Sequence, residues 1–172
     1  FARAIGAARA GRPQDSVADI EALKAVAATL RGANDAYWAD QTEILRLSAE
    51  AWAAFARGER EPALAALREA AVREDRTDKH PVTPGPLFPA REQLAEMLLL
   101  MDRPAEAQRE YEAVQKTEPR RFRAVHGAAR SAERAGDRDA ARRHYALLLE
   151  VAAKAEMPNP TLAAARAYLD QR

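Results

Sequence analysis

Few residues in this chain could carry out chemistry. It has 172 residues with three histidines and no cysteine, which excludes thiolate catalysis, disulfides and cysteine-ligated zinc. The remaining cluster centres on His80, which stands close to Asp75, Asp78 and Lys79. One histidine with two nearby carboxylates offers fewer ligands than zinc or copper sites use. The sequence therefore predicts no metal, although a metal-dependent or catalytic role of the His80 loop stays open as an alternative.

A row of arginines forms the second group of candidates. Arg123, Arg130 and Arg134 are spaced so that they share one face of a helix. Guanidinium groups arranged in this way can bind a carboxylate or a phosphate bidentately. Residues 120–145 hold eight arginines and three acidic residues, whereas residues 91–118 hold four basic and seven acidic residues. The alternative is a solvated charged face on which Arg130 and Arg134 pair with acidic side chains, namely Glu133, Asp137 or Glu96 of the adjacent helix.

The charge of the whole chain argues against two classes of partner. The formal net charge is only +1, so there is no strong positive field to attract nucleic acid or an anionic membrane. No apolar run is long enough to cross a bilayer. We therefore expect a soluble protein, cytoplasmic or periplasmic, and the excess of arginine over lysine favours a bacterial source. The chain begins with Phe1, and we expect it to be a processed chain or a piece of a longer protein.

Known catalytic motifs do not occur in the chain. It has no glycine-rich phosphate loop, no nucleophile elbow and no HExxH helix. The sequence accordingly predicts a protein that is not an enzyme and that needs no cofactor.

The elements that must position these residues are predicted to be helices, because the chain is rich in alanine and poor in glycine and β-branched residues. Asn34 is predicted to cap the helix that follows it, and Gly58 and Gly136 suit left-handed turns. The predicted helices cover residues 2–10, 15–30, 35–57, 61–75, 90–101, 104–117, 121–135, 138–154 and 161–171.

An internal repeat organises these helices. A small residue, a large one four positions later and an apolar one three further stand at Ala107, Tyr111 and Val114. The same pattern recurs 34 residues downstream, again 44 residues upstream, and in a degenerate form near the amino end. Such periodic units stack on one another to bury a shared core.

The 34-residue period, the helix pairs and the small-residue positions resemble the tetratricopeptide repeat (TPR) family. The resemblance implies an all-α, right-handed α-solenoid of antiparallel helix pairs, with about three to four repeats and a capping helix at 161–171. The run of residues 74–98 also resembles the C-terminal region of larger bacterial TPR proteins of unassigned function. The repeats of this single predicted domain lie at about 1–31, 35–76, 88–119 and 121–154.

A proline-rich insertion separates two of the repeats. The 44-residue spacing exceeds the period by ten residues, which fall in the strap at 77–89. Prolines such as Pro81 and Pro84 fix their backbone, so the strap is predicted to be ordered and polyproline-like. Its structural interpretation is that Leu87 and Phe88 fill the gap between opened repeats. Its functional interpretation is a loop that carries a site around its histidine.

The TPR resemblance also implies a binding groove. In that family the first helix of each pair lines a concave face, which binds a peptide or a partner domain. The chain lacks asparagine on these helices, so we do not expect it to clamp the carboxylate tail of a chaperone. The groove positions carried over to this sequence are Trp52, Phe55, Glu92, Glu96, Arg123, His126, Arg130 and Arg134.

Self-association is a further alternative. Trp38, Leu45 and Trp52 recur every seven residues on one predicted helix, a spacing typical of helix–helix seams. This stripe could pack in the core, under the first repeat, or form a seam between two copies of the chain. A separate alternative for the whole chain is docking to a missing N-terminal region.

Overall fold

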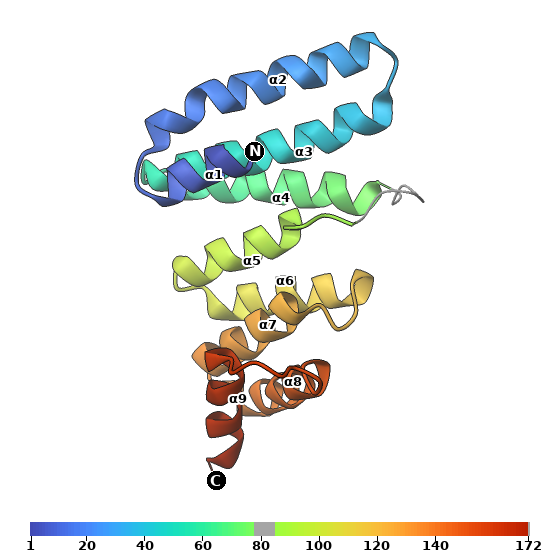
Figure 1. Ribbon diagram of the computed structural model, residues 1–172. Coiled ribbons are helices and arrows are strands. Elements are labelled where there is room, and N and C mark those ends of the chain that lie inside the picture. Colours follow the sequence, from blue (N-terminus) through green and yellow to red (C-terminus); the bar gives the residue numbers. More distant parts are fainter. Residues whose placement is uncertain (78–84, 172) are drawn as a thin grey trace. The chain divides into compact units, whose positions relative to one another are not determined.

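The computed structural model describes residues 1–77 and 85–171, and within them it contains helices, turns and loops but no strand (Figure 1). The all-α prediction is confirmed. One difference is at the start of the second predicted helix, where a 3-10 turn, Pro13–Ser16, precedes the α-helix. The elements are α1 (Ala2–Arg9), η1 (Pro13–Ser16), α2 (Val17–Gly32), α3 (Ala36–Ala56), α4 (Arg60–Arg76), α5 (Ala90–Leu100), α6 (Pro104–Thr117), α7 (Phe122–Ala135), α8 (Arg138–Val151) and α9 (Pro160–Asp170).

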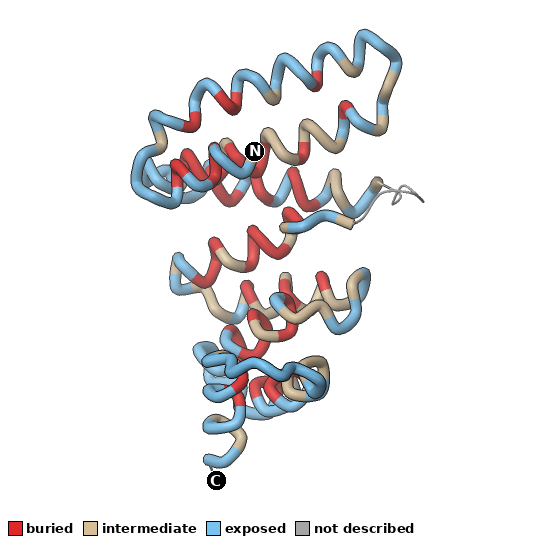
Figure 2. Tube along the Cα trace, in the orientation of Figure 1, coloured by how far each residue is buried: buried red, intermediate tan, exposed pale blue. Residues whose placement is uncertain are grey.

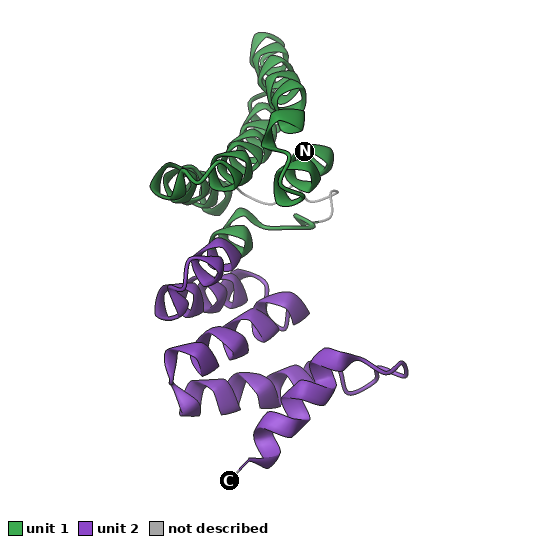
Figure 3. Cartoon of the chain, turned by 90° about the vertical axis from the view of Figure 1, so that its left-hand side faces the viewer, with its two compact units in different colours: residues 1–94 green, residues 95–172 purple. Residues whose placement is uncertain are grey.

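The chain divides into two compact units, unit 1 at Phe1–Leu94 and unit 2 at Ala95–Arg172 (Figure 3). The boundary falls within α5. None of the helices in the described residues is both long enough and apolar enough to span a membrane.

Unit 1 is built around α3, which α2 and α4 flank (Figures 1 and 2). The central helix carries small and apolar residues around most of its circumference, and nine of its residues are buried. A helix that is apolar on several sides must be covered on those sides. One cluster of the core joins Ile44 and Leu47 of α3 to Ala70 and Ala71 of α4 and to Ala90 of α5.

The short helix α1 is held by both packing and charge. Its Ile5 is buried against the rest of unit 1. The guanidinium of Arg3 binds both carboxylate oxygens of Asp19 on α2, with Nε 2.7 Å from Oδ2. The hydrogen bond from Arg3 keeps the pKa of Asp19 below its ordinary value of 3.8.

Acid is expected to loosen α1. Because the pKa of Asp19 is lowered in the folded state, its contribution to stability is complete at neutral pH and is lost as the pH falls below about 3.8. Trp38→Phe leaves Trp52, over which Arg9 of α1 lies, as the sole tryptophan. Its emission should change in this acid range, and Asp19→Asn should remove that step. Identical titrations of the two proteins would contradict the assignment to Asp19.

Unit 2 packs its helices in sequence, α6 on α7, α7 on α8 and α8 on α9. The repeated motif explains this packing, since its members turn inward: Ala107, Tyr111, Val114, Ala141, Tyr145 and Leu148 are all buried. The last helix contributes Leu162 and Ala165 to the core around Tyr145. In unit 2 the predicted capping helix thus covers apolar surface of the preceding pair.

The predicted turn and cap residues between the helices are found in the structure, with one exception. Gly58 and Gly136 have left-handed backbones, with φ of 87° and 79°, as predicted. Asn34 does not cap α3. It takes a left-handed backbone itself at φ 61°, and Asp35 is the cap, accepting a hydrogen bond from the Trp38 backbone N–H at 3.3 Å. Both residue types suit helix caps and left-handed turns, so the pattern alone did not separate them.

Candidate functional site

Trp52, a predicted groove residue, is held inside unit 1. Its side chain is only 2% exposed. The Nε1–H group donates a hydrogen bond to Oε1 of Gln93 at 3.0 Å, and Gln93 in turn donates to the carbonyl of Phe88 at 2.9 Å. The guanidinium of Arg9 lies 4.5 Å from the centre of the indole ring. Trp52 therefore joins α1, α3 and α5 within the core of this unit.

The other two predicted positions in unit 1 differ in exposure. Glu92 on α5 is buried, with 1% of its surface exposed. Phe55 is half-buried, meets Trp52 edge to face at 6.1 Å between ring centres, and lies 5.7 Å from the guanidinium of Arg60. Of these three predicted positions in unit 1, only Phe55 has appreciable surface that a partner could contact; Trp52 and Glu92 have almost none.

Five of the predicted positions lie in unit 2, and one of them, Glu96, is on α5. The other four share one largely exposed face of α7, which we call the α7 basic face: Arg123, His126, Arg130 and Arg134. Ion pairs hold its two ends. Arg123 lies 3.4 Å from Glu96 of α5. Arg134 donates to Oδ1 of Asp102 at 2.8 Å and to the carbonyl of Leu99 at 3.0 Å.

Arg130 stands in the middle of this face. It is exposed, and no described residue forms a hydrogen bond or ion pair with it. His126 is half-buried beside it, and burial together with the positive charge of Arg130 lowers the pKa of the imidazole below 6.5. The centre of the face therefore carries a cation and a neutral imidazole, flanked by two arginine–carboxylate pairs. Such an arrangement is suited to a carboxylate from outside the unit.

The predicted pairing of the arginines is partly corrected. Glu96 was expected to form an ion pair with Arg130 or Arg134, but it forms one with Arg123. Glu133 instead accepts a hydrogen bond from the hydroxyl of Tyr145 at 2.6 Å. That bond and burial raise the pKa of Tyr145.

The proline-rich strap is described only at its ends. His80, Pro81 and Pro84 lie outside the described residues, so the predicted role of this loop stays a prediction. Leu87 and Phe88 were expected to fill a gap between repeats. For Leu87 that prediction is wrong, because 92% of the residue is exposed, whereas Phe88 is half-buried.

The described residues contain no group of three or more histidine, cysteine, aspartate or glutamate side chains that could hold a metal ion. His144 pairs with Glu112, with Nε2 3.0 Å from Oε1.

The stripe of Trp38, Leu45 and Trp52 runs from the surface into the core. Trp38 is 44% exposed, Leu45 is half-buried and Trp52 is buried. Only the amino end of the stripe thus faces solvent, so a self-association seam along its whole length would require α3 to be uncovered first.

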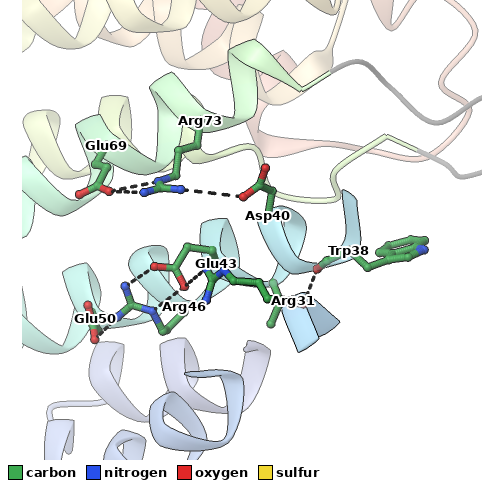
Figure 4. Close-up of polar contacts among 9 residues, drawn as sticks. Arg31, Trp38, Asp40, Glu43, Arg46, Glu50, Glu69 and Arg73 are labelled. Carbon is green, nitrogen blue, oxygen red and sulfur yellow. Dashed lines mark hydrogen bonds and ion pairs between the residues drawn. The ribbon is translucent and has the colours of Figure 1, made fainter. Parts of the chain in front are cut away.

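Sequence reasoning missed two features of unit 1. One is a polar network in which Arg46 binds Glu43 at 2.7 Å and also binds Glu50 (Figure 4); its signal was the three- and four-residue spacing of opposite charges. The second is an apolar cleft of about 330 Å³ among α2, α3 and α4. No sequence pattern could have indicated the cleft, because residues from three separate helices line it.

Comparison with known proteins places the fold. No protein-family model matches the chain, and no curated protein does either. Among solved structures, it is similar to the TPR-like repeats of a Podosopora anserina protein of the kinesin light chain type, at 20% identity and a TM-score of 0.64, covering 96% of this chain and 79% of that one. It is also similar to the MamA protein, at 22% identity and a TM-score of 0.53, covering 90% of this chain and 87% of that one. The predicted resemblance in fold to TPR proteins is confirmed.

Proposed function

We propose that this chain, an α-solenoid with the fold of TPR-like repeat proteins, is a non-catalytic interaction module whose α7 basic face binds an acidic segment of a partner protein. The observation that carries the proposal is Arg130, which is exposed at the centre of the face without an ion pair among the described residues. A guanidinium binds carboxylates through two parallel hydrogen bonds, which gives both affinity and orientation.

The flanking ion pair of Arg134 favours exchange with a partner. The side chains of Arg134 and Asp102 are 40% and 83% exposed, and an exposed pair of this kind contributes less than about 1 kcal/mol. A carboxylate on the partner can therefore replace Asp102 at little cost while Arg134 keeps its hydrogen bond to the carbonyl of Leu99. An acidic segment several residues long would then meet Arg123, Arg130 and Arg134 along one helix face.

The surroundings favour a protein over a nucleic acid. Glu96 and Asp102 lie at the two ends of the face, and the whole chain carries a net charge of only +1. A polyphosphate backbone would be repelled by these carboxylates and would find few additional cations. A short peptide can place its acidic side chains between them.

Charge reversal at Arg130 tests the proposal. Peptides selected from a displayed random library on the wild-type protein should be enriched in aspartate and glutamate. Arg130→Glu should weaken their binding about tenfold or more, because a hydrogen bond to a charged group contributes about 1.5–3 kcal/mol. Binding would be measured by isothermal titration calorimetry with the selected peptides.

Arg109→Glu is the matched control, since Arg109 is an exposed arginine on α6. It should change the affinity less than about twofold, in line with a remote surface charge. Circular dichroism should show equal helicity for both variants. Acidic peptides that bind Arg130→Glu as tightly as wild type would overturn the proposal.

A further inference from the structure

We infer that unit 1 carries a second docking site, the apolar cleft among α2, α3 and α4, and that it receives one large apolar side chain from a partner segment with a lysine or arginine beside it. The site lies in unit 1, whereas the α7 basic face lies in unit 2. It would bind a basic segment, whereas the α7 basic face would bind an acidic one. It is therefore independent of the function proposed above.

The floor of the cleft is small and apolar. Ala53 and Ala54 of α3 lie at its base with Ile20 of α2, and all three are buried. Because an alanine side chain ends at Cβ, neighbouring helices cannot fill the space above it without longer side chains of their own. A volume of about 330 Å³ is at the small end of ligand sites, so it suits a single side chain better than a cofactor.

The walls of the cleft present apolar surface to solvent. Val17 at the start of α2 is 56% exposed, Pro62 of α4 is exposed and Ala66 is half-buried. Removing such surface from water is favourable by about 25 cal/mol per Å². An aliphatic or aromatic side chain inserted here would cover all three residues and the alanine floor together.

The rim of the cleft selects the charge of the partner. Of the lining residues, Glu21 and Glu50 are acidic and Arg57 is basic. Arg57 donates two hydrogen bonds to Glu59, at 2.9 and 3.0 Å, and it also interacts electrostatically with Glu50. Glu21 has only a 3.7 Å contact with Lys24, and both side chains are about two-thirds exposed.

Glu50 keeps an accessible carboxylate even though it pairs with Arg46. Its side chain is 41% exposed, and Arg46 divides its guanidinium between Glu50 and Glu43 (Figure 4). The lining residues themselves hold two carboxylates, Glu21 and Glu50, and one guanidinium, that of Arg57. They therefore carry one negative charge in excess, which a cation on the partner would neutralise. An apolar residue next to a lysine or arginine matches both the floor and the rim.

The test is a selection of random peptides from a displayed library on wild-type protein, followed by affinity measurements on variants. Ala66→Trp fills the cleft, and Ala65→Trp places the same side chain at the neighbouring exposed position of α4. We expect one family of peptides with a leucine, methionine or aromatic residue within two positions of a lysine or arginine. Its binding should fall at least tenfold with Ala66→Trp and less than about twofold with Ala65→Trp.

A second variant tests the charge and does not depend on the cleft tolerating tryptophan. Glu21→Lys, at an exposed position, should weaken the same peptides several-fold and leave Arg130-dependent acidic peptides unchanged. The inference is overturned if no selected family loses affinity with Ala66→Trp, or if the cleft-dependent peptides carry no basic residue. Failure of the α7 basic face would instead appear as acidic peptides indifferent to Arg130→Glu, so the two outcomes are separable.

Discussion

Gly127→Ala is expected to destabilise unit 2 by about 1–3 kcal/mol, the usual cost of overpacking a core. A Cβ at this position of α7 would lie only 2.3 Å from Cζ of Tyr111 and 2.4 Å from its Cε1. The ring belongs to α6 and is buried, so it has little room to withdraw. The close approach of two helices at this glycine is what the substitution removes.

A loss of stability in Gly127→Ala would be the reverse of the usual effect, because alanine normally stabilises a helix relative to glycine by about 1 kcal/mol. Such a loss would therefore point to the contact with Tyr111. Gly6 in α1 is the control, since a Cβ there would have no heavy atom within 4 Å, and Gly6→Ala should be neutral or stabilising. Urea unfolding followed by circular dichroism gives both values. Adding Tyr111→Leu to Gly127→Ala should recover part of the loss. A neutral Gly127→Ala variant would show that the ring can move aside.

Trp52→Ala is expected to cost unit 1 about 3–5 kcal/mol, as for other large aromatic residues removed from a core. The indole is 2% exposed, covered by Arg9 on one side and by Gln93 at its nitrogen. Trp52→Phe keeps much of the packing but leaves the Gln93 oxygen without its donor, and should cost about 1–3 kcal/mol.

Trp38→Phe is the matched control, since Trp38 lies on the same helix and is 44% exposed. Exposed substitutions usually change stability by less than about 0.5 kcal/mol. Denaturant unfolding of the three variants gives the comparison. Equal stabilities for Trp52→Ala and Trp38→Phe would show that Trp52 is not part of the core and would return it to the set of partner-binding residues.

Local signals made the helices predictable. Alanine-rich segments are separated by glycines and prolines that end or begin a helix, and these act within a few residues of their own position. The repeated motif added long-range information, because the same inward-facing residues recur in each helix pair. Asn34 and Asp35 show the limit of such reasoning: the two adjacent residues have similar preferences, and the cap is Asp35, one position after the residue predicted for it.

The site was less predictable than the fold. The family pattern assigned Trp52 to a groove, but the two side chains that cover it, Arg9 and Gln93, come from α1 and α5, and nothing local signals their approach. The arginines of α7 share one face, since helical spacing alone fixes that, whereas their role in binding stays a prediction. Which carboxylate pairs with which arginine depends on side-chain reach between helices, so Glu96 was assigned to the wrong partner.

The turn between α5 and α6 has an evolutionary consequence. Asp102 holds a left-handed backbone at φ 57°, a conformation that glycine adopts without the steric cost borne by other residues, while its carboxylate binds Arg134. One codon therefore controls two properties, the strain of a turn and the charge at one end of the α7 basic face. Asp102→Gly would relieve the steric cost of the turn and remove one partner of Arg134, which keeps its hydrogen bond to the carbonyl of Leu99. A single substitution outside α7 would thus change both the turn and the charge at one end of the α7 basic face.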